Sequence, residues 1–131
     1  MILDTSIFVD LLRTGRHDDK IDGIDGHLRT SSVVLAELLR GVKSRSESTF
    51  LSVLQRNHPL LTPTQNNWIE SGELLGKMHI AHGFGLAKLR DLHFDVLIAL
   101  TARQYGARLI TSNRADFELI RTYREFDLEV W

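Results

Sequence analysis

Short apolar runs alternate along the chain with longer segments whose apolar residues recur every three or four positions. The short runs predict strands at 1–3, 28–31, 60–61, 107–111 and 128–131. The longer segments predict helices at 5–12, 33–41, 47–56, 64–82, 91–106 and from about 114 onward. Residues 15–26 are rich in Asp and Gly and predict a loop or a short helix. This alternation indicates an α/β fold with a mainly parallel sheet and helices on both faces.

The composition is typical of a soluble globular domain. With 131 residues the chain can bury one core, so we expect a single domain spanning residues 1–131. The absence of cysteine excludes disulfides, thiolate zinc sites and cysteine nucleophiles, and it fits a reducing cytoplasm. The longest apolar stretch is too short to span a membrane, and the strand predicted at the first residues leaves no room for a signal peptide. We therefore expect a cytoplasmic protein.

The net charge of -1 argues against a protein that coats nucleic acid through phosphate contacts alone, because such proteins are usually strongly basic. Arg40, Lys43 and Arg45 nevertheless cluster in sequence and predict a local basic patch. Taken alone, this cluster is most simply interpreted as a solvated helix end.

Three acidic residues each lie alone in an apolar run: Asp4 in MILDTSIF, Glu37 in VVLAELL and Asp95 in HFDVLIAL. Burying a lone carboxylate is costly unless a cation neutralises it. No basic residue lies within four positions of Asp4, and Arg40 is the only one that close to Glu37. A divalent metal would supply the missing charge, since Mg²⁺ prefers oxygen ligands.

Each acid also has a simpler explanation. Asp4 would cap the first helix, and Asp95 would cap or start another, with Asp91 as a competitor for any role. Asp116 follows the fourth predicted strand, where the helix dipole alone favours an acid. Glu37 is harder to explain as a surface residue because apolar residues surround it. In α/β folds ligands bind beyond the carboxyl ends of the strands, and Asp4 and Asp116 both follow predicted strands. The four acids together are therefore stronger evidence for a metal site than any one of them.

Three segments, LDTSIFVDLLR, TSSVVLAELLRGV and FDVLIALTARQYGARLITSNRADFELI, resemble PIN domains, and specifically the VapC-type toxins of toxin-antitoxin systems. The resemblance runs over essentially the whole chain. It implies a three-layer α/β/α arrangement with a central, mainly parallel five-stranded sheet. It also implies an endoribonuclease that depends on Mg²⁺, accepts Mn²⁺ and cleaves RNA. Members of the family often form homodimers, and a cognate antitoxin usually inhibits the toxin.

The resemblance assigns residues by position. The four acids of the family match Asp4, Glu37, Asp95 and Asp116, and its supporting polar positions match Ser6, Thr111 and Asn113. Asp95 is preferred to Asp91 because the family's third acid precedes an apolar D-x-x-I-A helix, as in residues 95–99. One departure is Phe94, where many relatives carry a small or polar residue. It removes no ligand, and the sequence leaves open whether it alters substrate access.

On this interpretation the carboxylates hold Mg²⁺, which activates a water for attack on a phosphodiester. Asp4 and Asp95 are the expected direct ligands, Glu37 a ligand or base, and Asp116 a ligand through water. Candidates to bind the RNA phosphates are the nearby cations Arg40, Lys43, Lys88, Arg90 and Arg114. An acidic groove would also attract an arginine of the antitoxin.

Other functions remain as alternatives. A phosphatase with Asp4 as nucleophile would need a second Asp two positions later, where Ser6 stands. A receiver domain would need a Lys before a late proline, and the prolines are only Pro59 and Pro63. A catalytically silent PIN-like binding module is the remaining alternative. His79 and His82 lack a third zinc ligand of suitable spacing. Trp68 and Trp131 are expected to pack rather than to stack on bases.

Overall fold

The computed structural model describes residues 1–131. Seven helices and five strands follow one another along the chain. The strands are β1 (Ile2–Leu3), β2 (Thr30–Ser31), β3 (Leu60–Leu61), β4 (Leu109–Thr111) and β5 (Leu128–Val130). The helices are α1 (Thr5–Thr14), α2 (Asp18–Asp22), α3 (Ser32–Arg40), α4 (Arg45–Asn57), α5 (Gln65–His82), α6 (Leu86–Gln104) and α7 (Arg114–Tyr123). All five predicted strands and the predicted helices are present.

The strands are parallel throughout but do not form the one continuous sheet expected from the sequence. Strands β1, β4 and β5 pair in the order β1-β4-β5, and β2 pairs with β3 in a separate two-stranded sheet. Only the bridge between Ile2 and Arg29 joins the two sheets. At this bridge the Arg29 amide donates to Met1 O at 2.9 Å, and the next amide, that of Thr30, donates on the other side to Pro59 O at 3.2 Å. Strand β2 begins only at Thr30, so this segment pairs with β1 at this one position and the two sheets stay separate.

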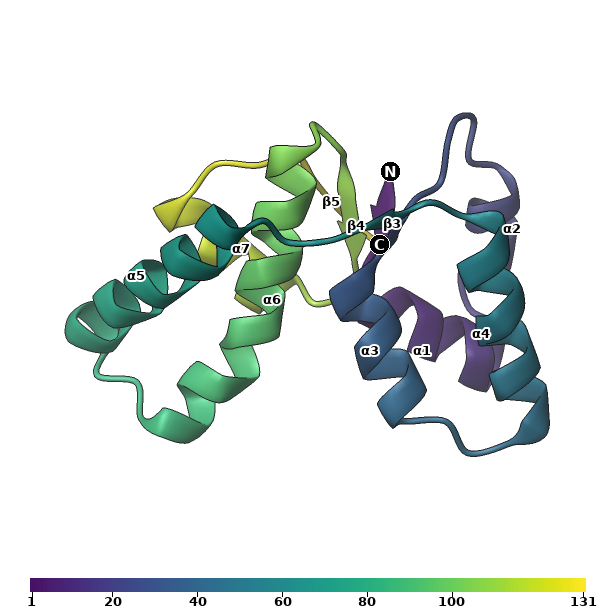
Figure 1. The fold of residues 1–131 in the computed structure, drawn as a ribbon, viewed down its shortest axis with the longest axis horizontal. Coiled ribbons are helices and arrows are strands. Elements are labelled where there is room, and N and C mark those ends of the chain that lie inside the picture. Colours follow the sequence, from purple (N-terminus) through teal and green to yellow (C-terminus); the bar gives the residue numbers. More distant parts are fainter.

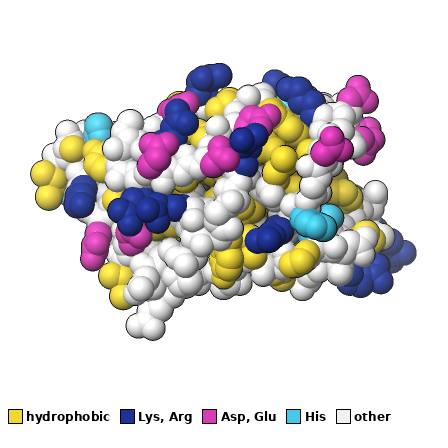
Figure 2. All heavy atoms as spheres, turned by 90° about the horizontal axis from the view of Figure 1, so that it is seen from above, with side chains coloured by type: hydrophobic (Ala, Val, Ile, Leu, Met, Phe, Trp, Pro, Cys, Tyr) yellow, Lys and Arg dark blue, Asp and Glu magenta, His cyan; other side chains and the backbone are white.

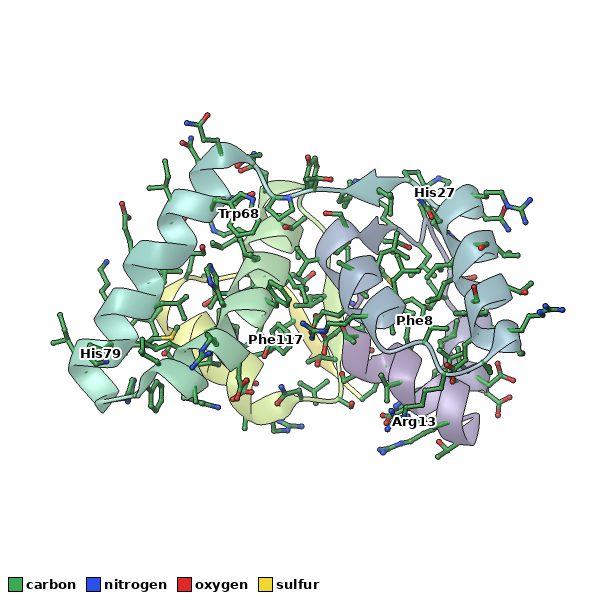
Figure 3. The ribbon with its side chains drawn as sticks, turned by 60° about the horizontal axis from the view of Figure 1, so that its bottom comes forward. Phe8, Arg13, His27, Trp68, His79 and Phe117 are labelled. Atoms are coloured by element: carbon green, nitrogen blue, oxygen red, sulfur yellow. The ribbon has the colours of Figure 1, made fainter.

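The strands lie between two groups of helices, α1 to α4 on one side and α5 to α7 on the other (Figure 1). Two buried phenylalanines mark the apolar packing on each side, Phe8 of α1 and Phe117 of α7 (Figure 3). Helix α6 packs against α5, α7 and α3, and every residue from Val96 to Ala102 is buried. This burial on all sides explains why the sequence there is a continuous apolar run rather than an amphipathic stripe.

Some helix ends differ from the predictions. Helix α6 begins at Leu86, five positions before the predicted start at 91, because Gly85 already adopts the extended N-cap conformation. Helix α4 begins at Arg45, where Ser44 Oγ accepts a 3.1 Å hydrogen bond from the Glu47 amide. None of the helices combines the length and apolar character that spanning a membrane requires. Acidic and basic side chains lie interspersed on the face shown in Figure 2.

Candidate metal centre

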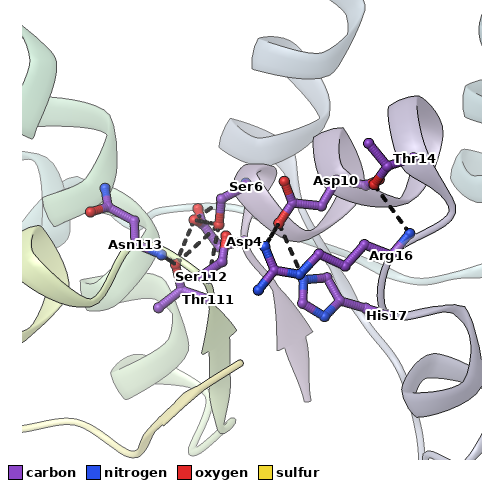
Figure 4. Close-up of polar contacts among 9 residues, drawn as sticks. All are labelled: Asp4, Ser6, Asp10, Thr14, Arg16, His17, Thr111, Ser112 and Asn113. Atoms are coloured by element: carbon purple, nitrogen blue, oxygen red, sulfur yellow. Dashed lines mark hydrogen bonds and ion pairs between the residues drawn. The ribbon is translucent and has the colours of Figure 1, made fainter.

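Asp4 lies at the carboxyl end of β1 and caps α1, with only 3% of the residue exposed. Its amide donates to Ile110 O of the neighbouring strand at 2.8 Å, which fixes the backbone. Its Oδ2 accepts hydrogen bonds from Ser6 Oγ at 2.7 Å and from Thr111 Oγ1 at 2.8 Å (Figure 4). Its Oδ1 is buried and has no hydrogen-bond partner. Burial raises the pKa of this carboxyl, although the hydroxyl donors oppose the shift.

A small network of hydroxyls and amides holds the donors to Asp4 in place. The Ser112 amide donates to Ser6 Oγ at 3.1 Å, and the Asn113 amide donates to Thr111 Oγ1 at 2.9 Å (Figure 4). The two hydroxyls lie 3.2 Å apart. The loop after β4 therefore orients Ser6 and Thr111, the two residues expected from the sequence to support the acid.

Glu37 extends from the middle of α3 toward the start of α1. Thr5 Oγ1 donates to Glu37 Oε1 at 2.9 Å. Burial raises the pKa of Glu37, and the charge of Asp4 raises it further, while Thr5 and Arg40 act in the opposite direction. Thr5 was not among the site residues predicted from the sequence. A hydroxyl residue directly after the capping acid was the signal that could have identified it.

Asp95 has a strongly perturbed carboxyl. Burial, followed by the charges of Asp4, Glu37 and Asp116, raises the pKa of Asp95 to about 8, and Lys88 opposes the shift. No protein group donates a hydrogen bond to its carboxylate, in contrast to the other three acids. Asp4 follows β1, and the other three acids come from α3, α6 and α7, so the fold brings the charges of Asp4, Glu37 and Asp116 to bear on Asp95.

Asp116 lies in the first turn of α7 and is held on both oxygens. Asn113, the N-cap of that helix, donates from Nδ2 to Asp116 Oδ2 at 3.1 Å. Lys88 of α6 donates from Nζ to Asp116 Oδ1 at 3.0 Å. Lys88 was expected to contact RNA phosphate, and in this structure its ammonium is paired with an acid of the site.

The donor set fits a hard divalent cation. All four side chains offer oxygen, three of them have raised pKa values, and one buried oxygen of Asp4 has no donor. No group of three or more acidic or histidine side chains is arranged to hold a metal ion by itself. Mg²⁺ commonly uses one or two carboxylates and keeps several waters, so an open arrangement of this kind is compatible with it.

A cleft opens in front of these acids. Its lining includes three of them, Glu37, Asp95 and Asp116, together with Asp91 and His93. The remaining lining residues are Arg40, Arg90 and Phe94. Of the five predicted RNA-binding cations, Arg40 and Arg90 thus line the cleft and Lys88 pairs with Asp116. Lys43 and Arg114 are exposed residues outside this lining.

The histidines and tryptophans singled out in the sequence are not among the residues that line this cleft. His79 Nδ1 is 2.6 Å from Phe84 O, and His82 Nε2 is 2.7 Å from the Tyr123 hydroxyl. Trp131 packs against His17, with ring centroids 5.5 Å apart. Trp68 lies on α5 and packs edge-on against His93 of α6 (Figure 3). The residue is 50% exposed, so the expectation that it packs is met for only part of its surface.

The fold is that of a known family. The family model described as PIN domain matches residues 1–123, and the chain belongs to the PIN-domain family. No curated protein sequence matches the chain.

Several solved structures share the fold. A chain of VapBC2 from Rickettsia felis, bound to a DNA fragment from their promoter, has a TM-score of 0.73 and 23% identity over 99% of this chain and 97% of that one. A chain of DNA-bound VapBC from Salmonella typhimurium has a TM-score of 0.71 and 22% identity over 99% and 96% of the two chains. A chain of a toxin-antitoxin complex from Klebsiella pneumoniae has a TM-score of 0.61 and 20% identity over 88% of each.

Proposed function

We propose that residues 1–131 form a single domain that acts as a metal-dependent endoribonuclease, hydrolysing RNA phosphodiester bonds in the cytoplasm. The observation that carries this proposal is the cleft lined by Glu37, Asp95 and Asp116, together with Asp4, whose Oδ1 is buried without a donor. The pKa of Asp95, raised to about 8 by burial and by the neighbouring acids, supports it. Such a concentration of uncompensated negative charge is costly in a structural site and useful where a cation binds.

Each acid of the site would have its own role in binding the metal ion. Mg²⁺, or Mn²⁺ in its place, would be held by Asp4 and Asp95 with Glu37 and Asp116 completing the set, and when bound it would supply an activated water and stabilise charge on the phosphate. Ser6 and Thr111 hold Oδ2 of Asp4, which leaves Oδ1 as the free oxygen.

The remaining polar residues orient the acids and handle the proton. Asn113 fixes the orientation of Asp116. Glu37 is the candidate to accept the proton of the attacking water, because its raised pKa makes it a better base than an ordinary carboxylate.

We further propose that the chain is the toxin of a type II toxin-antitoxin pair, restrained by a cognate antitoxin, and that it forms a homodimer. The support is the likeness of its fold to chains of the VapBC complexes and of the Klebsiella pneumoniae toxin-antitoxin complex. Arg40 and Arg90, at the rim of the acidic cleft, are the candidates to contact substrate phosphate.

The test is cleavage of a mixed pool of structured RNAs with Mg²⁺ present or chelated. The native chain is compared with Asp4→Asn, Asp95→Asn and the control Asp127→Asn, which changes an exposed acid paired with Arg108. We expect metal-dependent cutting that the first two substitutions abolish and the control retains. Equal cutting by all four preparations would contradict the proposal. No cutting, together with no Mn²⁺ binding by calorimetry, would favour the catalytically silent binding module.

A further inference from the structure

A cation and an aromatic ring lie in contact at the rim of the acidic cleft. The guanidinium of Arg40 lies over the ring of Phe94, with Cζ 5.7 Å from the ring centroid. Arg40 ends α3, three positions after Glu37, and Phe94 directly precedes Asp95 in α6. Both side chains line the same cleft as Glu37, Asp95 and Asp116. The pair is therefore placed beside the carboxylates rather than on a distant surface.

Neither member of this pair is engaged elsewhere in a way that accounts for it. None of the seven ion pairs in the structure includes Arg40, which is an exposed residue. Phe94 packs part of its ring against the core and remains partly accessible. The charge of Arg40 and one part of the Phe94 ring are thus available to a ligand in the cleft.

A cation beside an aromatic ring favours one class of ligand over others. A phosphate alone would be bound by the arginine and would gain nothing from a phenylalanine, and an apolar ligand would gain nothing from the cation. A nucleobase uses both, because its flat ring stacks on aromatic side chains and on guanidinium planes alike. In a duplex the bases are already stacked and paired, so only an unpaired base can reach such a surface.

We propose that Phe94 and Arg40 form a stacking platform for the nucleobase next to the scissile phosphate of the substrate. This inference rests on the proposed function, since it assigns two further residues of the same site to substrate binding. It gives Phe94 a role in substrate recognition. Arg90, which lines the same cleft, would contact the adjoining phosphate.

The experiment measures binding without cleavage. All variants carry Asp95→Asn, which removes one negative charge and keeps the oligomer intact. The probe is a fluorescent uridylate oligomer of about 12 nucleotides, within the usual site size of single-strand binders. It is compared with an oligomer of the same length lacking bases, with the same sequence as DNA, and with the RNA paired to its complement.

We expect Phe94→Leu to weaken binding of the uridylate oligomer by roughly ten- to a hundredfold, the range found when one stacking aromatic is lost. Phe94→Trp should restore binding, and Arg40→Lys, which keeps the charge but not the planar guanidinium, should weaken it by about fivefold. The oligomer without bases should bind weakly and equally to all variants. The matched control is Tyr105→Leu, an exposed aromatic at the far end of the same helix, and it should bind as the parent does.

Equal binding by Phe94→Leu and its parent, or no preference for bases, would overturn the platform. Failure of the Asp95→Asn parent to bind any single strand would overturn it as well. A Phe94-dependent affinity in a chain that never cleaves RNA would contradict the nuclease and leave the platform standing. DNA bound with the same dependence on Phe94 would support the platform, because stacking reads the base rather than the sugar.

Discussion

Thr111 Oγ1 donates a 2.8 Å hydrogen bond to Oδ2 of Asp4, although the two residues are 107 positions apart. The contact exists because β1 and β4 are parallel neighbours, so that their carboxyl ends lie together. Ser6 donates to the same oxygen, while Oδ1 remains buried and without a partner. The acid is therefore half satisfied by the protein, and its second oxygen is left for a ligand.

Thr111→Val should lower both the stability of the chain and its affinity for metal. Valine keeps the shape of threonine but removes a donor to a buried carboxylate, which costs about 1–3 kcal/mol. Loss of such a supporting hydrogen bond typically lowers metal affinity by roughly ten- to a hundredfold. Urea unfolding without metal and Mn²⁺ calorimetry would measure the two effects.

The chain supplies a matched control for that substitution. Thr30 is also a buried strand threonine, 1% exposed, but its Oγ1 has no hydrogen-bond partner. Thr30→Val should therefore leave stability unchanged or raise it, and metal affinity should stay as in the native chain. If both valine variants lose stability equally, the hydrogen bond to Asp4 is not the cause.

Stability of the metal-free chain should depend on pH through Asp95. Its pKa in the folded chain, about 8, lies above the ordinary value of 3.8. Well below pH 3.8 the carboxyl is protonated in both the folded and the unfolded chain, so it makes the free energy of unfolding no more dependent on pH. As pH rises toward 8, the unfolded chain releases the proton first, so the folded state becomes progressively less favourable. Asp4 and Glu37, whose pKa values are also raised, contribute in the same direction.

Asp95→Asn should therefore stabilise the chain in chelator, increasingly so from pH 5 to pH 8. The gain at pH 8 should be about 1 kcal/mol or more, since one pKa unit corresponds to about 1.4 kcal/mol. Denaturant unfolding at several pH values would measure it. Asp127→Asn, an exposed acid away from the cleft, should show no such slope, and a flat difference for Asp95→Asn would refute the assigned burial.

Divalent metal should reverse this behaviour. Mg²⁺ or Mn²⁺ at about 100 times its dissociation constant should stabilise the native chain by about 2.7 kcal/mol, by mass action on the folded state. Thermal unfolding with and without metal at pH 8 would detect the gain. It should vanish in Asp4→Asn and in Asp95→Asn. Equal stabilisation of all three chains would place the binding site elsewhere.

Lys88→Met should strengthen metal binding. The Lys88 ammonium lies 3.0 Å from Asp116 Oδ1 and competes there with any other cation. Partly exposed ion pairs of this kind are worth up to about 1 kcal/mol, so we expect a few-fold gain in Mn²⁺ affinity by calorimetry. Arg108→Met, which breaks pairs with Asp127 and Glu129, should leave that affinity unchanged. A loss of metal affinity in Lys88→Met would contradict the competition.

The relationship between Lys88 and Asp95 shows why helix ends matter for the site. The sequence placed the start of this helix near 91, which leaves Lys88 in a loop. Since α6 begins at Leu86, Lys88 lies seven positions before Asp95 on the same helix face. The break at residues 83–85 was predicted correctly, and the missed part is residues 86–90, which form the first turn of α6 directly after Gly85.

The sequence by itself determined the strands and helices and singled out four acids, three of which, Glu37, Asp95 and Asp116, line one cleft in the structure. Strand and helix periodicity are local properties, and a lone carboxylate in an apolar run is visible without any tertiary contact. The tertiary structure alone decided the rest: the separation into two sheets, the hydrogen bond from Thr5 to Glu37, the pairing of Lys88 with Asp116 and the stacking of Arg40 on Phe94. These contacts join distant segments, and their geometry follows from how α3, α6 and α7 pack around the strands, which no local pattern specifies.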